Sequence, residues 1–121
     1  MKRILVLMSL TIVVGFLLAG GVALAATFTG TPGPDTISGT TNADTIKGRA
    51  GNDHLYGRGG DDHIYGGNGY DVLRGANGND YIGANDGLHD AVYCGRGVDF
   101  AYADRSDTVY YGCETVRIDN P

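Results

Sequence analysis

The sequence predicts an all-β solenoid built from short parallel strands, and three observations lead to this prediction. From Gly30 to Gly83 the chain repeats every nine residues without interruption. Every unit carries an aspartate at its sixth place, and every unit carries a large aliphatic residue at its eighth. Self-similarity at a short fixed period indicates structural units that stack on one another and share a continuous core.

Six regular units make up this segment. Their sequences are GTPGPDTIS, GTTNADTIK, GRAGNDHLY, GRGGDDHIY, GGNGYDVLR and GANGNDYIG. The sixth-place acids are Asp35, Asp44, Asp53, Asp62, Asp71 and Asp80. The eighth-place aliphatics are Ile37, Ile46, Leu55, Ile64, Leu73 and Ile82.

Each unit divides into a six-residue turn and a three-residue strand. Glycines at the first, second and fourth places allow positive φ and a close approach of backbone. Asn42 takes the fourth place of the second unit, where asparagine is the next most tolerant residue. Side chains alternate along a strand, so only the eighth-place aliphatic points inward.

The repeat continues less regularly after Gly83. Asp90 and Val92 follow Asp80 and Ile82 by ten residues, which indicates a one-residue insertion within Ala84–Asp90. The eighth unit, Cys94–Tyr102, returns to the pattern, and a shortened ninth unit keeps Asp107 and Val109. We therefore expect an irregular C-terminal cap from about residue 84.

Residues 1–25 are predicted to be a secretory signal peptide. Lys2 and Arg3 precede an apolar stretch from Ile4 to Leu18, and Ala23-Leu24-Ala25 is a small-residue cleavage motif. The alternative is an uncleaved membrane anchor, since the apolar stretch is just long enough to span a bilayer. Residues 26–29 are expected to be a short linker, and 30–121 the repeat domain.

Charge argues against nucleic acid and anionic membranes as partners. Without the leader, the chain carries 7 basic and 14 acidic residues, a net charge of −7. Such partners select basic surfaces, whereas an acidic surface suits polyvalent cations.

The two cysteines, Cys94 and Cys113, are expected to form a disulfide, because they follow a secretion signal. A zinc site is a poor alternative, because two cysteines without a nearby histidine leave a tetrahedral site incomplete. The disulfide would tie the terminal segment, including Glu114 and Val116, over the open edge of the last coil.

The consensus G-G-x-G-x-D-x-U-x, with U a large aliphatic, resembles the calcium-binding nonapeptide repeats of the RTX (haemolysin-type) family. The resemblance implies a right-handed parallel β-roll of about nine short strands, with two units in each coil. Residues 18 apart would then be neighbours, about 4.8 Å apart along the stack. The leader and the cysteine pair make the chain similar to small secreted bacterial members rather than to the large toxins.

The resemblance also implies that calcium ions lie between stacked turns, held by sixth-place carboxylates and turn carbonyls. Asp53 would stack with Asp71, and Asp62 with Asp80; a cation between them removes their repulsion. Hard oxygen ligands in a flexible turn favour calcium over magnesium. The expected carboxylate ligands are Asp35, Asp44, Asp53, Asp62, Asp71, Asp80, Asp90 and Asp99. The expected carbonyls lie in the turns Gly48–Asp53, Gly57–Asp62, Gly66–Asp71 and Gly75–Asp80.

About four to six calcium ions are expected on this basis. Asp61 and Asp104 lie outside the sixth place and should matter less. The alternative is a metal-free solenoid in which the aspartates only cap turns by accepting nearby N–H groups.

The sequence offers no pattern of catalytic residues. Ser9, Ser38 and Ser106 lie in no nucleophile-elbow motif, and the repeat accounts for the carboxylates. The predicted function is extracellular calcium binding with calcium-dependent folding of the roll. The alternative is a calcium-stabilised structural or adhesive protein that binds carbohydrate or a protein partner. The tyrosines at ninth places motivate it: Tyr56, Tyr93 and Tyr110 on one face, Tyr65 and Tyr102 on the other.

Overall fold

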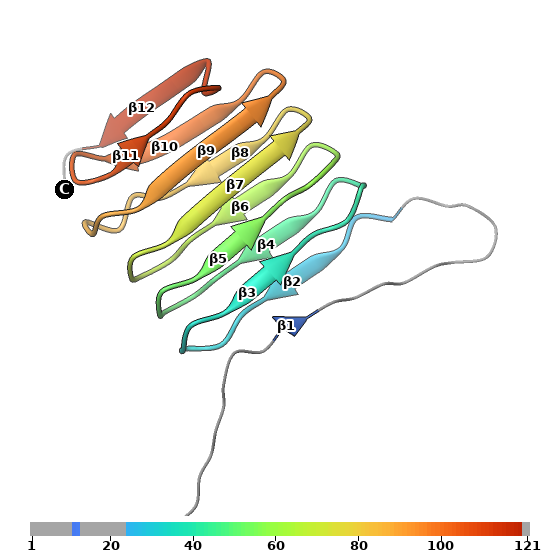
Figure 1. The fold of residues 1–121 in the computed structure, drawn as a ribbon, viewed down its shortest axis with the longest axis horizontal. Coiled ribbons are helices and arrows are strands. Elements are labelled where there is room, and N and C mark those ends of the chain that lie inside the picture. The colour runs from blue at the N-terminus through green and yellow to red at the C-terminus, as the bar shows by residue number, and fades with distance from the viewer. Residues whose placement is uncertain (1–10, 13–23, 120–121) are drawn as a thin grey trace, which may run out of the picture.

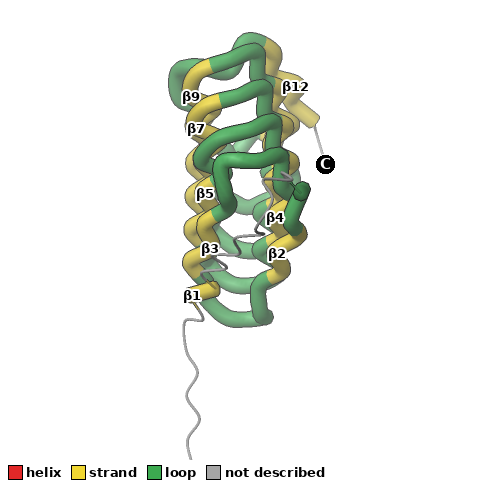
Figure 2. Tube along the Cα trace, turned by 90° about the vertical axis from the view of Figure 1, so that its right-hand side faces the viewer, coloured by secondary structure: helices red, strands yellow, loops and turns green. Residues whose placement is uncertain are grey.

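The computed structural model of the chain describes residues 11–12 and 24–119. The regular structure of these residues is entirely β, in twelve strands that form two six-stranded parallel sheets (Figure 1). The sheets are the two walls of a solenoid, and turns connect them at every half coil (Figure 2). No helix long and apolar enough to cross a membrane occurs among the described residues.

The strands alternate between the two sheets along the chain. Sheet A contains, in spatial order, β1 (Thr11–Ile12), β3 (Thr36–Ser38), β5 (His54–Tyr56), β7 (Val72–Asn77), β9 (Ala91–Arg96) and β11 (Thr108–Val109). Sheet B contains β2 (Thr27–Thr29), β4 (Thr45–Lys47), β6 (His63–Tyr65), β8 (Tyr81–Gly83), β10 (Phe100–Asp104) and β12 (Thr115–Asp119). The all-β parallel solenoid predicted from the repeat is confirmed.

The strand register confirms that two nonapeptides make one coil. Ile37 pairs with Leu55 and Leu55 pairs with Leu73, so neighbours are 18 residues apart. Leu73 then pairs with Val92, 19 residues on, where the sequence indicates a one-residue insertion. The extra residue is accommodated in the turn, and the strands stay in register.

The core is a single column of eighth-place side chains from both sheets. These residues have no exposed surface, because strand alternation turns them inward and the opposite sheet covers them. They are Ile37, Ile46, Leu55, Ile64, Leu73, Ile82 and Val92. Such a thin core buries little apolar area per residue, so the fold needs other sources of stability.

Residues 26–29 are not a linker, and this expectation was wrong. Thr27–Thr29 form β2, which pairs in register with β4, and Phe28 is buried in the core. Phe28 stands nine residues before Ile37, so it continues the inward-facing series with an aromatic residue in place of an aliphatic one. The solenoid therefore begins about half a coil earlier than the regular repeat.

The leader prediction concerns residues 1–25, most of which lie outside the described residues. The described pair Thr11–Ile12 forms β1, which lies beside β3 at the N-terminal end of sheet A (Figure 1). Cleavage after Ala25 stays a prediction.

The C-terminal segment covers the edge of β10 by forming one more strand. Strand β12 pairs with β10 in parallel register, from Phe100↔Thr115 to Asp104↔Asp119. The disulfide Cys94–Cys113 is present, with Cα atoms 5.1 Å apart, and it fixes the turn that leads into β12. All residues of β12 are exposed, so β12 is itself the last edge of sheet B.

Reduction of Cys94–Cys113 should destabilise the folded protein, because the bond closes a loop between residues 19 apart. The chain-entropy relation gives a loss of about 3 kcal/mol for a loop of this size. Thermal melting of reduced and alkylated protein against oxidised protein measures the effect. An unchanged melting temperature would show that β12 docks without help from the disulfide.

Candidate metal centre

The turns that precede the strands form two rows along the solenoid. We call row A the sixth-place residues Asp35, Asp53, Asp71 and Asp90, which precede strands of sheet A. We call row B the sixth-place residues Asp44, Asp62, Asp80 and Asp99, which precede strands of sheet B. All eight carboxylates are at most 3% exposed, so the eight predicted ligands are brought together as two buried columns.

Except in Asp35, one oxygen of each carboxylate links its own coil to the preceding coil. Asp53 Oδ1 accepts the backbone N–H of Asp35 at 2.8 Å, and Asp71 Oδ1 accepts that of Asp53 at 2.8 Å. Row A continues from Asp71 N–H to Asp90 at 2.7 Å. In row B, Asp62, Asp80 and Asp99 accept the N–H groups of Asp44, Asp62 and Asp80 at 2.8, 2.9 and 2.7 Å.

The other oxygen of most of these carboxylates has no protein partner. The unpartnered oxygens are the Oδ2 atoms of Asp53, Asp62, Asp71, Asp80, Asp90 and Asp99. A buried acceptor without a partner is costly, and more so when it carries charge. Three such oxygens lie in each row, and each needs a proton or a cation.

The first-place glycines bring backbone oxygen next to these unpartnered atoms. A Cβ on Gly48 would lie 2.5 Å from Asp53 Oδ2 and 2.6 Å from the carbonyl oxygen of Gly66 in the next coil. A Cβ on Gly57 would meet Asp62 Oδ2 at 2.5 Å and the carbonyl of Gly75 at 2.9 Å. Carboxylate and carbonyl oxygens thus face the same space, which only glycine leaves open.

The fourth-place glycines let successive turns stack closely. Gly69 and Gly78 have positive φ, and a Cβ on either would lie 2.1–2.2 Å from the carbonyl oxygen of the fourth-place glycine one coil earlier. Second-place residues also have positive φ, including Arg49 and Arg58, whose φ angles are 76° and 77°. These L-residues hold a conformation that normally favours glycine.

The first two turns have a different chemistry. Thr31 donates its backbone N–H to Asp35 Oδ2 at 2.6 Å, and its hydroxyl lies 3.0 Å from both Asp35 oxygens. Thr40 donates its N–H and hydroxyl to Asp44 Oδ2 at 2.6 and 2.8 Å. Asp44 Oδ1 accepts the N–H of Ala26 at 3.1 Å. Both oxygens of Asp35 and of Asp44 are therefore satisfied by protein.

Asn42 does not take the glycine-like conformation expected of it, since it is not among the positive-φ residues. Its N–H instead bonds to the Thr40 hydroxyl at 3.0 Å, in a turn that this hydroxyl organises. The hydrogen bonds of Thr40 therefore determine the backbone conformation of this turn.

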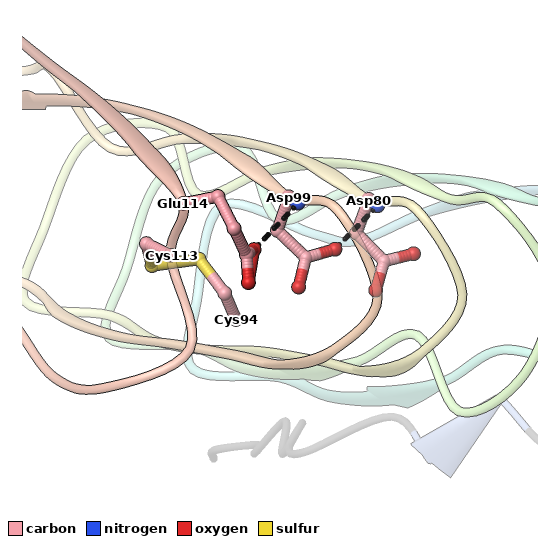
Figure 3. The surroundings of a disulfide bond; sticks show 5 residues. All are labelled: Asp80, Cys94, Asp99, Cys113 and Glu114. Atoms are coloured by element: carbon pink, nitrogen blue, oxygen red, sulfur yellow. Dashed lines mark hydrogen bonds between the residues drawn. A yellow bond between two sulfur atoms is a disulfide. The ribbon is translucent and has the colours of Figure 1, made fainter.

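Both rows continue beyond Asp90 and Asp99. Asp107 Oδ1 accepts the N–H of Asp90 at 2.8 Å. Glu114, next to the disulfide, accepts the N–H of Asp99 at 3.0 Å (Figure 3). Glu114 was not among the site residues predicted from the repeat, although Glu114-Thr115-Val116 repeats the acid-x-aliphatic pattern.

Asp104, which lies outside the sixth place, has a structural role. It is 2% exposed, and its Oδ2 accepts the N–H of Gly87 at 2.6 Å. Its Oδ1 accepts the Ser106 N–H at 2.8 Å and the Ser106 hydroxyl. Asp104 thus ties the irregular seventh turn to the shortened ninth turn, a role that arises from the insertion. The three histidines are exposed, as expected for seventh-place and irregular positions.

Burial raises the pKa of five row carboxyls far above their ordinary value of 3.8. The pKa rises to about 7 for Asp53, Asp71 and Asp80, and to about 8 for Asp62 and Asp90. The N–H donated by the preceding coil lowers each pKa in part, and neighbouring carboxylates raise it further. Without a cation these five carboxyls hold protons near neutral pH.

The site and the fold together define a class: a parallel β-solenoid whose glycine turns stack carboxylate and carbonyl oxygens in buried rows. The family model described as the RTX calcium-binding nonapeptide repeat matches in four copies, over residues 29–64 and 56–87. Residues 29–87 therefore carry repeats of the RTX calcium-binding family. Comparison with curated proteins and with solved structures found no match.

The residues present fit the cation that this family binds. The polar atoms next to the first-place glycines are hard carboxylate and carbonyl oxygens, and six carboxylate oxygens of the two rows are buried without a partner. Calcium takes six to eight oxygen ligands in flexible geometry, including carboxylates and backbone carbonyls.

Metal-free protein should become less stable as the pH rises from about 4 to about 8. Unfolded aspartates lose their protons near pH 4, whereas the row carboxyls of the folded state hold theirs up to about pH 7–8. The folded state then binds more protons, and the free energy of unfolding falls with pH. Thermal melts in metal-stripped buffers at pH 5 and pH 8 test this. A higher melting temperature at pH 8 would show that the rows are not protonated when empty of metal.

Proposed function

We propose that the protein binds calcium ions outside the cell and that binding completes the folding of its β-roll. The observation that carries this proposal is the set of six buried carboxylate oxygens without a protein partner. Those of Asp53, Asp62 and Asp80 share the space beside a first-place glycine with a backbone carbonyl of the next coil. A solenoid that buries this much unpaired acid is unfavourable at neutral pH unless a cation neutralises it. Calcium supplies both the charge and the missing ligand bonds.

The ions are proposed to lie between consecutive turns of the same row. Four stacked pairs have an unpartnered oxygen on both carboxylates. These pairs are Asp53–Asp71, Asp71–Asp90, Asp62–Asp80 and Asp80–Asp99. One ion for each pair gives four ions, the lower end of the roughly four to six expected.

Asp35 and Asp44 are proposed to be structural rather than principal ligands. Thr31 already donates hydrogen bonds to Asp35, and Thr40 donates them to Asp44. The N-terminal turn of each row is thus closed by a hydroxyl and a backbone N–H. This part of the roll is expected to form without metal and to serve as a template for the coils that need it.

An extracellular location is supported by the disulfide and by the predicted leader. Disulfides persist in oxidising compartments, and Cys94–Cys113 closes the C-terminal turn. Calcium is also abundant there, which suits extracellular modules with dissociation constants of about 0.1–1 mM.

Binding and scaffolding are favoured over catalysis, since the acids of the turns are engaged in the two rows.

The arrangement of the tyrosines gives little support to the adhesive alternative. Tyr93 stacks on Tyr110 with centroids 4.4 Å apart, and the Arg74 guanidinium lies 4.2 Å from the Tyr93 centroid. The ring faces are turned to one another along sheet A, whereas sugar binding needs a free face.

Calcium titration tests the proposal directly. Metal-free protein at pH 7.5 should gain β-structure by circular dichroism at about 0.1–1 mM calcium, and magnesium at equal concentration should not replace it. Identical spectra in calcium and in excess chelator would refute calcium-dependent folding.

Asp62→Asn and Asp44→Asn form a matched pair within row B. Both aspartates are buried, and both accept a backbone N–H that asparagine can still receive. Asp62→Asn removes a proposed ligand and should lower the stoichiometry measured by calorimetry by at least one ion. Asp44→Asn should leave the stoichiometry unchanged. Equal loss in both variants would contradict the structural role assigned to the threonine-capped turns.

A further inference from the structure

The irregular seventh turn holds an acid at its third place, where none of the six-residue turns has one. Asp86 is the third residue of the turn that begins at Ala84. The third places of the other turns are Pro32, Thr41, Ala50, Gly59, Asn68, Asn77 and Arg96. Asp86 is therefore outside the nonapeptide pattern and outside the ligand set that the repeat implies.

The fold brings Asp86 to two carboxylates of row A. One carboxylate oxygen from each of Asp71, Asp86 and Asp90 lies within 4.8 Å of the others. Asp71 and Asp90 are 2% and 0% exposed, and each keeps one oxygen without a partner. The other oxygens of these two residues already accept N–H groups along the row.

We propose that Asp71, Asp86 and Asp90 form a three-carboxylate calcium site that fills before the sites in the regular turns. This inference rests on the proposed function, because it ranks one site within the same rows. A regular stacked pair offers two formal negative charges, whereas this site offers three. Calcium affinity in proteins rises with the number of charged ligands and with the rigidity of the site.

Asp86 is held in place before any ion arrives. Its Oδ2 accepts the N–H of Gly69 at 3.0 Å, and its Oδ1 accepts the N–H of Leu88 at 2.9 Å. Gly69 belongs to the turn that ends at Asp71, so Asp86 bridges two coils. Each oxygen has a second lone pair, which remains available to a cation.

Asp86 also gives this site an opening to solvent. It is half-buried, unlike Asp71 and Asp90, and it lines a hollow of about 350 Å³ with Tyr65, Asn68, Tyr81 and Asn85. The added residue lengthens the turn outward, and a Cβ on Gly87 would meet no atom within 4 Å. A hydrated ion can therefore reach the third carboxylate first and lose its water while entering the row.

Asp86→Asn and Asp61→Asn test the proposal as a matched pair. Asp61 is also a turn acid outside the sixth place, and it accepts the N–H of Asn79 at 2.8 Å, but it lies outside the cluster. Stepwise calcium binding is measured by competition with a chromogenic chelator. Wild type should bind one ion about tenfold or more tighter than the rest; Asp86→Asn should lose that step and Asp61→Asn should keep it.

The outcomes separate this inference from the proposed function. If wild type binds no calcium, the proposed function itself is wrong. If wild type binds several ions and both variants lose affinity equally, Asp86 acts only through net charge and the three-carboxylate site is overturned. Retention of the tight step in Asp86→Asn would overturn it as well.

A second measurement covers the case in which Asp86→Asn fails to fold at saturating calcium. One equivalent of gadolinium, a trivalent ion that three carboxylates neutralise, is added to calcium-loaded wild-type protein. The amide signals of Gly69 and Leu88 should broaden before that of Asn79, which precedes Asp80 of row B. Equal broadening of both rows would contradict a preferred site at Asp86.

Discussion

Burial of a carboxylate between every pair of stacked turns is the constraint on which this fold depends. Every row residue after Asp35 uses one oxygen to accept an N–H from the coil before it, as Asp53 does from Asp35. That bond joins the coils but leaves the second oxygen enclosed and, in six residues, without a partner. The same carboxylate therefore both builds the stack and creates the need for a cation.

The ends of the rows show how protein groups can meet that need without metal. At the N-terminal end the Thr31 and Thr40 side chains and N–H groups supply the donors. At the C-terminal end the rows finish on Asp107, whose oxygens accept the N–H groups of Asp90 and Asp104, and on Glu114, which is exposed to solvent. Unpartnered oxygens are confined to the coils between these ends.

The thin core explains why so many stabilising features lie outside it. One inward side chain per nonapeptide gives a column of aliphatics, which is little apolar burial for the number of residues ordered. Parallel ladders, stacked aromatics such as Tyr81 and Phe100, and the Cys94–Cys113 bond add to it. Bound ions would act in the same direction, since ligands that bind only the folded state stabilise it.

The sequence by itself determined the stacking of short strands, because a nine-residue period with one inward residue favours that arrangement, and it determined the disulfide partners. The resemblance to the RTX repeats implied two units per coil, and with them the two rows of aspartates and the register up to Leu73. Only the tertiary structure decided which aspartates remain unsatisfied, because that depends on whether a second-place side chain folds back, as Thr31 and Thr40 do. It likewise decided that Phe28 opens the core, that Glu114 ends row B and that Asp86 joins Asp71 and Asp90. These contacts depend on where irregular turns lie in space, which a repeat pattern does not encode once the period is broken.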